Sequence, residues 1–584
     1  MTMTVRPAPA ARDAARVGLT ARVASLVLLA GSVVMLAVLV YVGRWLTFWS
    51  DEWDWLFRRA DPSLQSLLGG SDVHLHLFPV LIYQALFRIV GLSNYYPYLA
   101  VAWALHLSCA WLLFAFTGRL AGWGFGLVAG LSLLFLGSGF EVLLQPGQMG
   151  YALSEAMGLL ALVLLLGRSD SEHARLRAIV AAVALCVGIA SSGVGMFFVG
   201  LIVVWTGLRR DWSGLASALP AFLAFAIWFP IWSARTTVRL PLTVTSLLQI
   251  PAYVLYGLGA TVTAVIGLPP YRFALAGIVI AVIGVAIVWW LGARGDALAL
   301  GALGALVAEF TLVAGFRPEF GIGWVARSGY LHPAAAFLWL IAAAVWVDPR
   351  CRLRSWLRPW MVAVVLVLAI AANMVQFSGA ARGMRVLRAT EIAYLRLLEA
   401  LRDSPDLDPD ARGLFKITAR RYLPAIDRFG APALASREPT LAEPGVADRA
   451  DLDRMLVALV GASIRPVADG KIAGDRPRVS VTGGVEEPAG SSCVRIAAGR
   501  GHATGTWVPA TGAFSLASET PGAVRAVRVG AFSRPAQVIE AIESVPRDTG
   551  GVVRLPRLPA DLRWAVQVDV AAGETVTVCS ATAA

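Results

Sequence analysis

The chain has 584 residues, of which 57% are hydrophobic and 15% are charged. Because soluble domains carry about 25% charged residues, this composition excludes a single water-soluble globular protein, and it is too apolar for a disordered one. Membrane proteins collect basic residues in their cytoplasmic loops, so the net charge of +12 leads us to expect membrane lipids as partners and no nucleic acid.

Long apolar segments follow one another through the first two thirds of the chain. A helix needs about 20 apolar residues to cross a bilayer. We expect a polytopic α-helical membrane protein with about eleven transmembrane helices, at 23–42, 97–118, 121–139, 150–167, 178–191, 193–208, 216–234, 273–292, 297–316, 334–347 and 360–379. The segment 251–268 is also apolar, but Pro251, Pro269 and Pro270 bracket it, and we expect a helix that lies in the outer interface or dips into it.

The arginines predict the orientation. Four of them precede the first span, in the tail 1–22, and later groups fall on alternate short loops. Under the positive-inside rule, this pattern predicts a cytoplasmic N-terminus and, after eleven spans, an extracytoplasmic C-terminus. No small-residue cleavage site follows the first span, so we interpret it as an uncleaved anchor in the plasma (inner) membrane.

The composition changes after Ala380. The transmembrane domain, 23–380, has few charges in its spans, whereas the basic and acidic side chains of the remainder are nearly balanced. Helical periodicity at the start of the remainder predicts a helical connector at 381–475. Short alternating runs rich in Val and Thr predict a small β-sandwich at 476–584, which makes the extracytoplasmic part an α+β domain.

Two cysteines, Cys493 and Cys579, fall on predicted strands of this domain. They are either two unpaired buried thiols or a disulfide. An oxidising extracytoplasmic compartment favours the disulfide.

The first external loop, 43–96, opens with three acids within four positions: Asp51, Glu52 and Asp54. They follow a membrane span directly and stand among tryptophans, where a carboxylate is costly to desolvate. In a helix, Asp51 and Asp54 share one face, and a desolvated Asp51 is suited to act as a general base. Alternatively, the acids cap a short interfacial helix that has Ser50 as its N-cap.

A second polar segment in this loop contains Asp72, His74 and His76. Two histidines two positions apart lie on one side of an extended segment, where they could bind a divalent ion or hold an anionic phosphate. The alternative is a pair of interfacial histidines bonded to loop backbone. The amphipathic segment 79–90 follows and predicts a helix on the outer leaflet.

These patterns resemble the GT-C superfamily of integral membrane glycosyltransferases. The acidic pair Asp51 and Glu52 at the start of a large external loop, followed by Asp72 and His74 near a proline, is most similar to protein mannosyltransferases and aminoarabinose transferases. The number of spans, the interfacial helix and the external β-domain also resemble actinobacterial arabinofuranosyl- and mannosyltransferases. The chain departs from the family's double proline after the histidine, where it has Leu75 and His76.

The resemblance implies a sugar donor linked to polyprenyl phosphate and a glycan, lipid or protein acceptor of the cell envelope, on the extracytoplasmic face. It implies inverting transfer, in which Asp51 takes the proton of the acceptor hydroxyl and Glu52 orients the acceptor or the base. Members of the superfamily differ in metal use. A divalent metal cofactor therefore stays open, with Asp51, Glu52 and His74 as possible ligands.

The leaving phosphate of such a reaction needs cations. In the loop 317–333, Arg327 and Tyr330 place a guanidinium fork beside a hydroxyl, which suits a phosphate. The further candidates for the donor phosphate are His74, Arg235 and Arg239. Polar loop side chains that would bind the sugar or the acceptor, or would be ordinary loop tips, are Asp54, Asp72, His76, Glu141, Gln145 and Gln148.

Other functions remain open at this stage. A secondary transporter or a flippase for lipid-linked glycans usually has inverted repeats and charges at the bilayer midplane, whereas the spans here carry only Glu155 and Glu309. A polysaccharide polymerase or ligase would use the same external arginines. A non-catalytic assembly factor would use the β-domain for binding. The sequence contains no P-loop and no supported nucleophile elbow.

Overall fold

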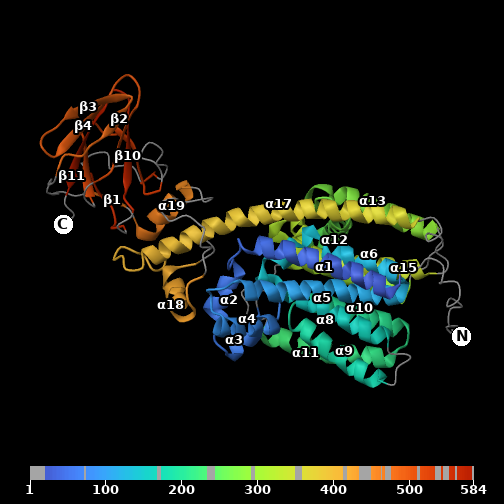
Figure 1. Ribbon diagram of the computed structural model, residues 1–584. Helices are drawn as coiled ribbons and strands as arrows, with labels where there is room; N and C mark the ends of the chain where they lie inside the picture. The colour runs from blue at the N-terminus through green and yellow to red at the C-terminus, as the bar shows by residue number, and fades with distance from the viewer. Residues whose placement is uncertain are drawn as a thin grey trace. The chain divides into compact units, whose positions relative to one another are not determined.

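The computed structural model describes residues 20–70, 74–167, 173–232, 244–290, 296–348, 358–411, 417–432, 449–461, 463–466, 475–509, 513–532, 541–542, 551–558 and 562–581. The predicted site residues Asp72, Arg235 and Arg239 lie outside these ranges. The chain divides into two compact units, residues 1–383 and 384–584. Figure 1 shows helices throughout the first unit and a β-structure in the second.

The first unit is a bundle of apolar helices that identifies a multi-pass membrane protein. Within the described residues, eight helices are long and apolar enough to cross a membrane, and a ninth span is possible if the bent pair α6 (Trp123–Leu134) and Gly137–Leu144 counts as one. The eight are α1 (Ala21–Gly43), α5 (Tyr96–Ala121), α8 (Met149–Leu166, with the preceding turn), α11 (Trp212–Trp232), α12 (Val244–Val265), α14 (Ala297–Phe316), α15 (Ser328–Val347) and α17 (Pro359–Ala400).

Exposed apolar side chains show which helices face lipid. Only 11% of the most apolar 18-residue stretch of α17 is buried inside the protein. On α1, Leu26, Leu29 and Val33 are exposed. Lipid can cover these side chains, whereas water would leave a large apolar patch exposed. Asn373 of α17 is buried and donates to the backbone of Ala264, so a polar side chain anchors this helix to the bundle.

The helix count differs from the predicted eleven at identifiable places. The predicted spans at 178–191 and 193–208 are α9 (Ala174–Ile189) and α10 (Val194–Leu208), which have 16 and 15 residues. The predicted span at 273–292 lies in α13 (Pro270–Trp290). The segment expected in the interface belongs to α12, which runs through Pro251 and packs against α13 and α14. Pro251 is the eighth residue of α12, where a proline removes one backbone hydrogen bond, but the packing against α13 and α14 keeps the helix continuous.

The first loop forms three short helices: α2 (Asp51–Arg59), α3 (Leu64–Leu68) and α4 (Leu77–Ile89). They pack on one another and lie together at one end of the bundle (Figure 1). A capping box between Ser63 and Ser66 begins α3. The loop is therefore folded against the bundle and can position polar side chains.

The second unit contains the end of α17, two helices, α18 (Ala419–Phe429) and α19 (Arg449–Val460), and two antiparallel sheets. One sheet has the order β1 (Ser463–Pro466), β9 (Gly551–Arg554), β6 (Ala513–Ser518), β11 (Thr575–Ala581), β4 (Cys493–Ala498), β3 (Gly484–Pro488). The other has the order β2 (Ser480–Thr482), β5 (Ala503–Trp507), β10 (Ala565–Val570), β7 (Val524–Gly530), β8 (Ala541–Ile542). The first strand thus begins before residue 476, the predicted start of the β-sandwich.

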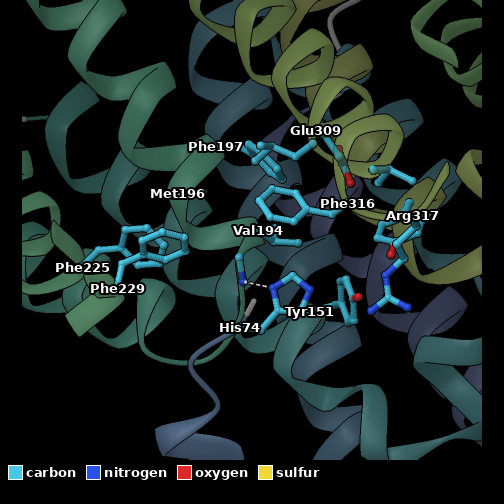
Figure 2. Close-up of a pocket in the computed structure, with 14 residues that line it drawn as sticks. His74, Tyr151, Val194, Met196, Phe197, Phe225, Phe229, Glu309, Phe316 and Arg317 are labelled. Carbon is cyan, nitrogen blue, oxygen red and sulfur yellow. Dashed lines mark hydrogen bonds between the residues drawn. The ribbon is translucent and has the colours of Figure 1, made fainter. Parts of the chain in front are cut away.

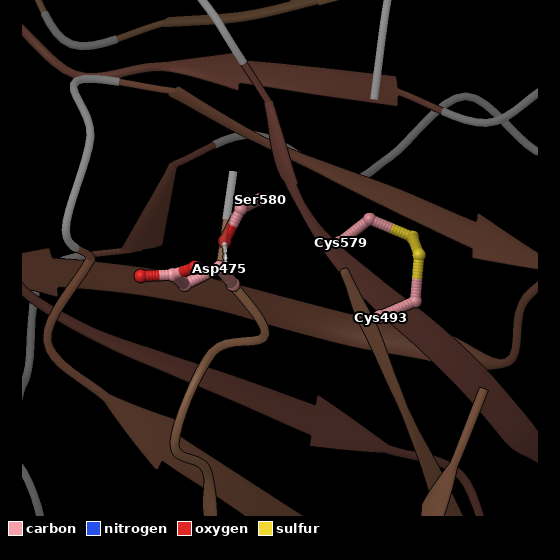
Figure 3. The surroundings of a disulfide bond; sticks show 4 residues. All are labelled: Asp475, Cys493, Cys579 and Ser580. Atoms are coloured by element: carbon pink, nitrogen blue, oxygen red, sulfur yellow. Dashed lines mark hydrogen bonds between the residues drawn. A yellow bond between two sulfur atoms is a disulfide. The ribbon is translucent and has the colours of Figure 1, made fainter. Parts of the chain in front are cut away.

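Alternating burial packs the two sheets face to face. On β10, Val566, Val568 and Val570 are fully buried, whereas the residues between them are partly exposed. A Cβ at Gly505 would lie 2.4 Å from the end of the Ile496 side chain of the other sheet, so the two sheets approach closely here. Figure 3 shows the disulfide between Cys493 on β4 and Cys579 on β11, which are directly paired residues of neighbouring strands.

Candidate functional site

Glu52 is the buried centre of the first loop, with 1% of its surface exposed. Its carboxylate accepts hydrogen bonds from the Trp49 amide (2.8 Å) and from the hydroxyls of Tyr83 and Tyr95, the latter at 2.8 Å. Burial and the Glu52 carboxylate raise the pKa of Tyr83 well above its ordinary value, so this hydroxyl remains a donor. Glu52 therefore ties α2 to α4 and to the residue before α5, and it fixes the position of its neighbour Asp51.

Asp51 and Asp54 lie on the same short helix in different surroundings. Asp51 is exposed at the first position of α2, with the Ser50 hydroxyl 3.5 Å from its Oδ1. Ser50 has a φ of 48°, which is strained for a residue other than glycine. Its side chain makes no capping hydrogen bond, although it stands at the N-cap position. Asp54 forms an ion pair with Arg58 at 2.7 Å on an exposed surface.

The two histidines dock on the backbone between α9 and α10. The Gly193 amide donates to Nδ1 of His74 (3.2 Å), and Nδ1 of His76 lies 3.0 Å from the Ser191 carbonyl oxygen. In a neutral ring, the first contact leaves the proton of His74 on Nε2. Burial, together with the neighbouring His74 and Arg59, lowers the pKa of His76 to about 3, so His76 is neutral. His76 therefore holds the loop in place.

A second polar cluster joins α7 (Phe140–Leu144) to the start of α15. Nε of Arg327 lies 3.1 Å and 2.9 Å from the two carboxylate oxygens of Glu141, and the Gly329 amide donates to the same carboxylate. Arg327 also stacks over the Trp324 ring. Burial lowers the pKa of Arg327, but Glu141 outweighs this effect and raises it overall, so the guanidinium is charged. Within the ranges that the structure describes, no partner bonds the two terminal nitrogens of Arg327.

Further polar side chains gather around Gly329. A Cβ at this position would lie 3.7 Å from Glu141 Oε2, 3.9 Å from Gln148 Oε1 and 3.9 Å from the Tyr151 ring. Tyr151 meets the next residue of α15, Tyr330, edge to face. Gln145 is buried nearby in sequence, at the end of α7. This cluster thus presents a guanidinium, an amide and two phenols next to a backbone without a side chain.

A cavity of about 190 Å³ opens beside this cluster (Figure 2). Its walls are mainly apolar and aromatic, from α10, α11 and α14, and include Phe197, Phe225 and Phe316. Its polar lining residues are His74, Tyr151, Glu309, Arg317 and Tyr330. A pocket of this kind fixes a ligand through a few polar groups on an apolar surface.

Deeper in the bundle, three buried side chains form a chain of hydrogen bonds. Oε2 of Glu155 lies 2.6 Å from Nδ1 of His332, and Nε2 of His332 lies 2.9 Å from Nδ1 of His106. His106 Nε2 lies 3.0 Å from the Leu134 carbonyl oxygen. All three side chains have no exposed surface, so they link α5, α8 and α15 inside the membrane unit.

The structure brings together only part of the predicted set. His74 and Tyr330 line one cavity, and Arg327 and Glu141 are paired next to it. Asp54 is paired with Arg58, and His76 is hydrogen-bonded to the backbone of Ser191. Of the other polar cavity residues, Arg317 and Tyr151 stand in the two external loops that the sequence indicated for phosphate and sugar. Glu309 was not predicted as a site residue, and only its charge within an apolar span could have indicated it.

Among the described residues, no group of three or more His, Cys, Asp or Glu is placed to hold a metal ion.

No model of a protein family matches the chain, and no curated protein matches its sequence. The fold is similar to the crystal structure of ArnT from Cupriavidus metallidurans bound to undecaprenyl phosphate, with 17% identity over 70% of this chain and 85% of that chain, and a TM-score of 0.40.

Proposed function

We propose that the protein transfers a sugar from a polyprenyl-phosphate-linked donor to a hydroxyl of a cell-envelope glycan, lipid or protein. The observation that supports it is the cavity where apolar aromatic walls meet His74, Arg317 and Tyr330. A sugar phosphate on a lipid tail needs a site with cations inside an apolar membrane bundle. A soluble sugar nucleotide would not need its site inside such a bundle.

Two arginines stand at this polar end. Arg317 lines the cavity, and Arg327 is held by Glu141 and Trp324 while its terminal nitrogens remain available among the described residues. A guanidinium fork binds phosphate oxygens in two places. In the proposed reaction these arginines stabilise the negative charge that grows on the leaving polyprenyl phosphate.

Asp51 is the proposed general base. It is exposed, and its neighbour Glu52 is fully engaged by tyrosine hydroxyls and backbone. The Asp51 carboxylate takes the proton of the acceptor hydroxyl, the acceptor oxygen bonds to the anomeric carbon, and the bond from that carbon to the phosphate oxygen breaks. Attack opposite to the leaving phosphate inverts the anomeric carbon. The positive-inside pattern of arginines supports an extracytoplasmic location for this step.

The test uses the full chain in lipid nanodiscs with polyprenyl phosphate that carries a radiolabelled pentose or hexose, and a cell-envelope glycan acceptor. We expect labelled glycan with the wild type and a loss of at least about 100-fold with Asp51→Asn. Asp410→Asn, a change of the same kind at an exposed ion pair of the second unit, is the matched control. If Asp51→Asn transfers as fast as wild type, Asp51 is not the base.

The same preparation separates transfer from transport. In proteoliposomes, a flippase would move the labelled lipid across the bilayer without labelling any acceptor. That result would replace the proposed glycosyltransferase with the transporter hypothesis.

A further inference from the structure

Glu309 is an acid in the interior of a membrane helix, and it lines the cavity (Figure 2). It lies on α14, two turns before Arg317, and only 1% of its surface is exposed. Among the described residues, neither carboxyl oxygen has a hydrogen-bond partner. Every neighbouring wall residue from the same helix, Leu312, Val313 and Phe316, is apolar.

An unpartnered carboxyl group in a membrane interior is unfavourable, because neither lipid nor apolar side chains replace its bonds to water. A leucine at this position would fill the space without that penalty. Buried polar groups without partners in a folded protein need an explanation, and a ligand that completes their bonding is one. The Glu309 carboxyl group can therefore accept a hydrogen bond from a ligand inside the cavity.

The other polar groups of the cavity have the opposite character. Arg317 carries a positive charge that suits an anion, and Tyr330 and His74 line the cavity with a hydroxyl and an imidazole ring. A ligand that bonds both Arg317 and Glu309 carries an anionic group and, a short distance away, hydroxyl or ammonium donors. A sugar phosphate has this pattern, whereas a prenyl chain has no donor for Glu309.

The size of the cavity agrees with this pattern. Pockets for drug-sized ligands measure about 300–1,000 Å³, and this one measures about 190 Å³. It has room for one sugar ring, with aromatic walls against the apolar faces of the ring, but not for a long polyprenyl chain.

We infer that the cavity seats the sugar ring of the lipid-linked donor and that Glu309 selects this sugar by accepting a hydrogen bond from one of its hydroxyl or amino groups. This inference rests on the proposed function, and it adds a specificity-determining residue to it. The phosphate then lies at the Arg317 end, and the prenyl chain leaves the cavity toward lipid.

The experiment measures dissociation constants of three probes for the full chain in nanodiscs: farnesyl phosphate, farnesyl-phosphoryl-arabinofuranose and farnesyl-phosphoryl-mannose. The variants are Glu309→Leu, which removes the acceptor, and Glu309→Gln, which keeps an acceptor oxygen. Glu319→Gln, at an exposed residue just outside the cavity, is the matched control. Thermal unfolding without ligand shows whether each variant folds.

We expect the wild type to bind at least one sugar lipid about 10-fold or more tightly than farnesyl phosphate, as one hydrogen bond to an otherwise unpaired buried group would give. Glu309→Leu should abolish this preference while its affinity for farnesyl phosphate stays within about 2-fold and its melting temperature does not fall. Glu309→Gln should keep part of the preference, and Glu319→Gln all of it.

Three results would overturn the inference. The sugar preference could survive in Glu309→Leu, the leucine variant could weaken all three probes equally, or the wild type could show no preference for a sugar lipid over farnesyl phosphate. Each of these leaves the proposed function standing. If the wild type binds none of the three probes, the proposed function fails, and this inference fails with it.

Discussion

Arg327 and Glu141 are 186 residues apart in the chain, and Nε of the arginine lies 2.9 Å from Oε2 of the glutamate. Glu141 bonds the Arg327 guanidinium at Nε, so the pair holds the guanidinium from one side only. The Glu141 amide also donates to the Ser328 hydroxyl, so backbone and side chain both join α7 to α15. The pair therefore orients a cation next to the cavity.

Arg327→Lys should lower the rate of sugar transfer by about 100-fold, the usual effect of removing one donor to a developing negative charge. Lysine keeps the charge but cannot bond Glu141 and a phosphate with one planar fork. Glu141→Gln should have a smaller effect, about 10-fold, because it removes only the group that orients Arg327. Initial rates of the two single variants and of the double variant measure their coupling. Fully additive effects would mean that the pair does not act as a unit.

Substitutions at Glu52 and Asp51 should affect different properties, stability at Glu52 and activity at Asp51. Glu52→Gln places an amide N–H₂ against donors and should destabilise the protein by about 2–4 kcal/mol, because three buried hydrogen bonds end on this carboxylate. Asp51→Asn changes an exposed residue and should leave the melting temperature unchanged. Fluorescence-monitored thermal unfolding of both variants in detergent makes the comparison. The assignment is wrong if Asp51→Asn melts early and Glu52→Gln does not.

His76 should make the stability of the protein depend on pH. Its pKa is lowered to about 3 in the folded protein, whereas an unfolded histidine titrates near 6.5. Between these values the unfolded chain binds one more proton, so stability falls as the pH decreases from about 6.5 toward 3, by about 1.4 kcal/mol per pH unit. In His76→Gln, which can still donate to the Ser191 carbonyl oxygen, this contribution is absent. Melting temperatures of both proteins at pH 7.5 and 5.0 give the difference, and equal shifts would contradict the prediction.

The sequence predicted the class of fold because membrane spans follow from length and hydropathy, which are local. The count was less accurate for the same reason. The apolar segments at 178–191 and 193–208 turned out to be helices of 16 and 15 residues, and Pro251 did not end a helix that packs on two neighbours. Tertiary packing decides such cases, and hydropathy does not contain it.

The candidate site shows the same limit. The acids after the first span could be identified from their position, but the sequence could not tell that Glu52 is enclosed while Asp51 is exposed. The tyrosines that enclose Glu52 are 31 and 43 residues away. Glu155 and His332 meet across 177 residues, and nothing local marks them as partners.

The chain of Glu155, His332 and His106 allows a prediction from hydrogen positions. The Leu134 carbonyl can only accept, so His106 Nε2 carries a hydrogen, and a neutral His106 then accepts at Nδ1 from His332. One proton is therefore shared between Glu155 and His332 Nδ1, and the chain has no net charge. Glu155→Gln can still donate to His332 and should melt near wild type. Glu155→Leu leaves a ring nitrogen unpaired and should cost about 1–3 kcal/mol. Equal melting temperatures for the two variants would contradict this hydrogen arrangement.

The disulfide between Cys493 and Cys579 should contribute much of the stability of the second unit. It closes a loop of 86 residues, which in the chain-entropy model is worth about 4–5 kcal/mol. Cys493→Ala should lower the unfolding temperature of this unit in the full chain, and the double variant Cys493→Ala, Cys579→Ala should melt about where the single variant does, because either change removes the whole bond. A reductant should lower the transition of the wild type and leave that of the double variant unchanged. Since Cys109 and Cys186 are free thiols in the first unit, a reductant effect that persists in the double variant would show that the stabilisation has another source.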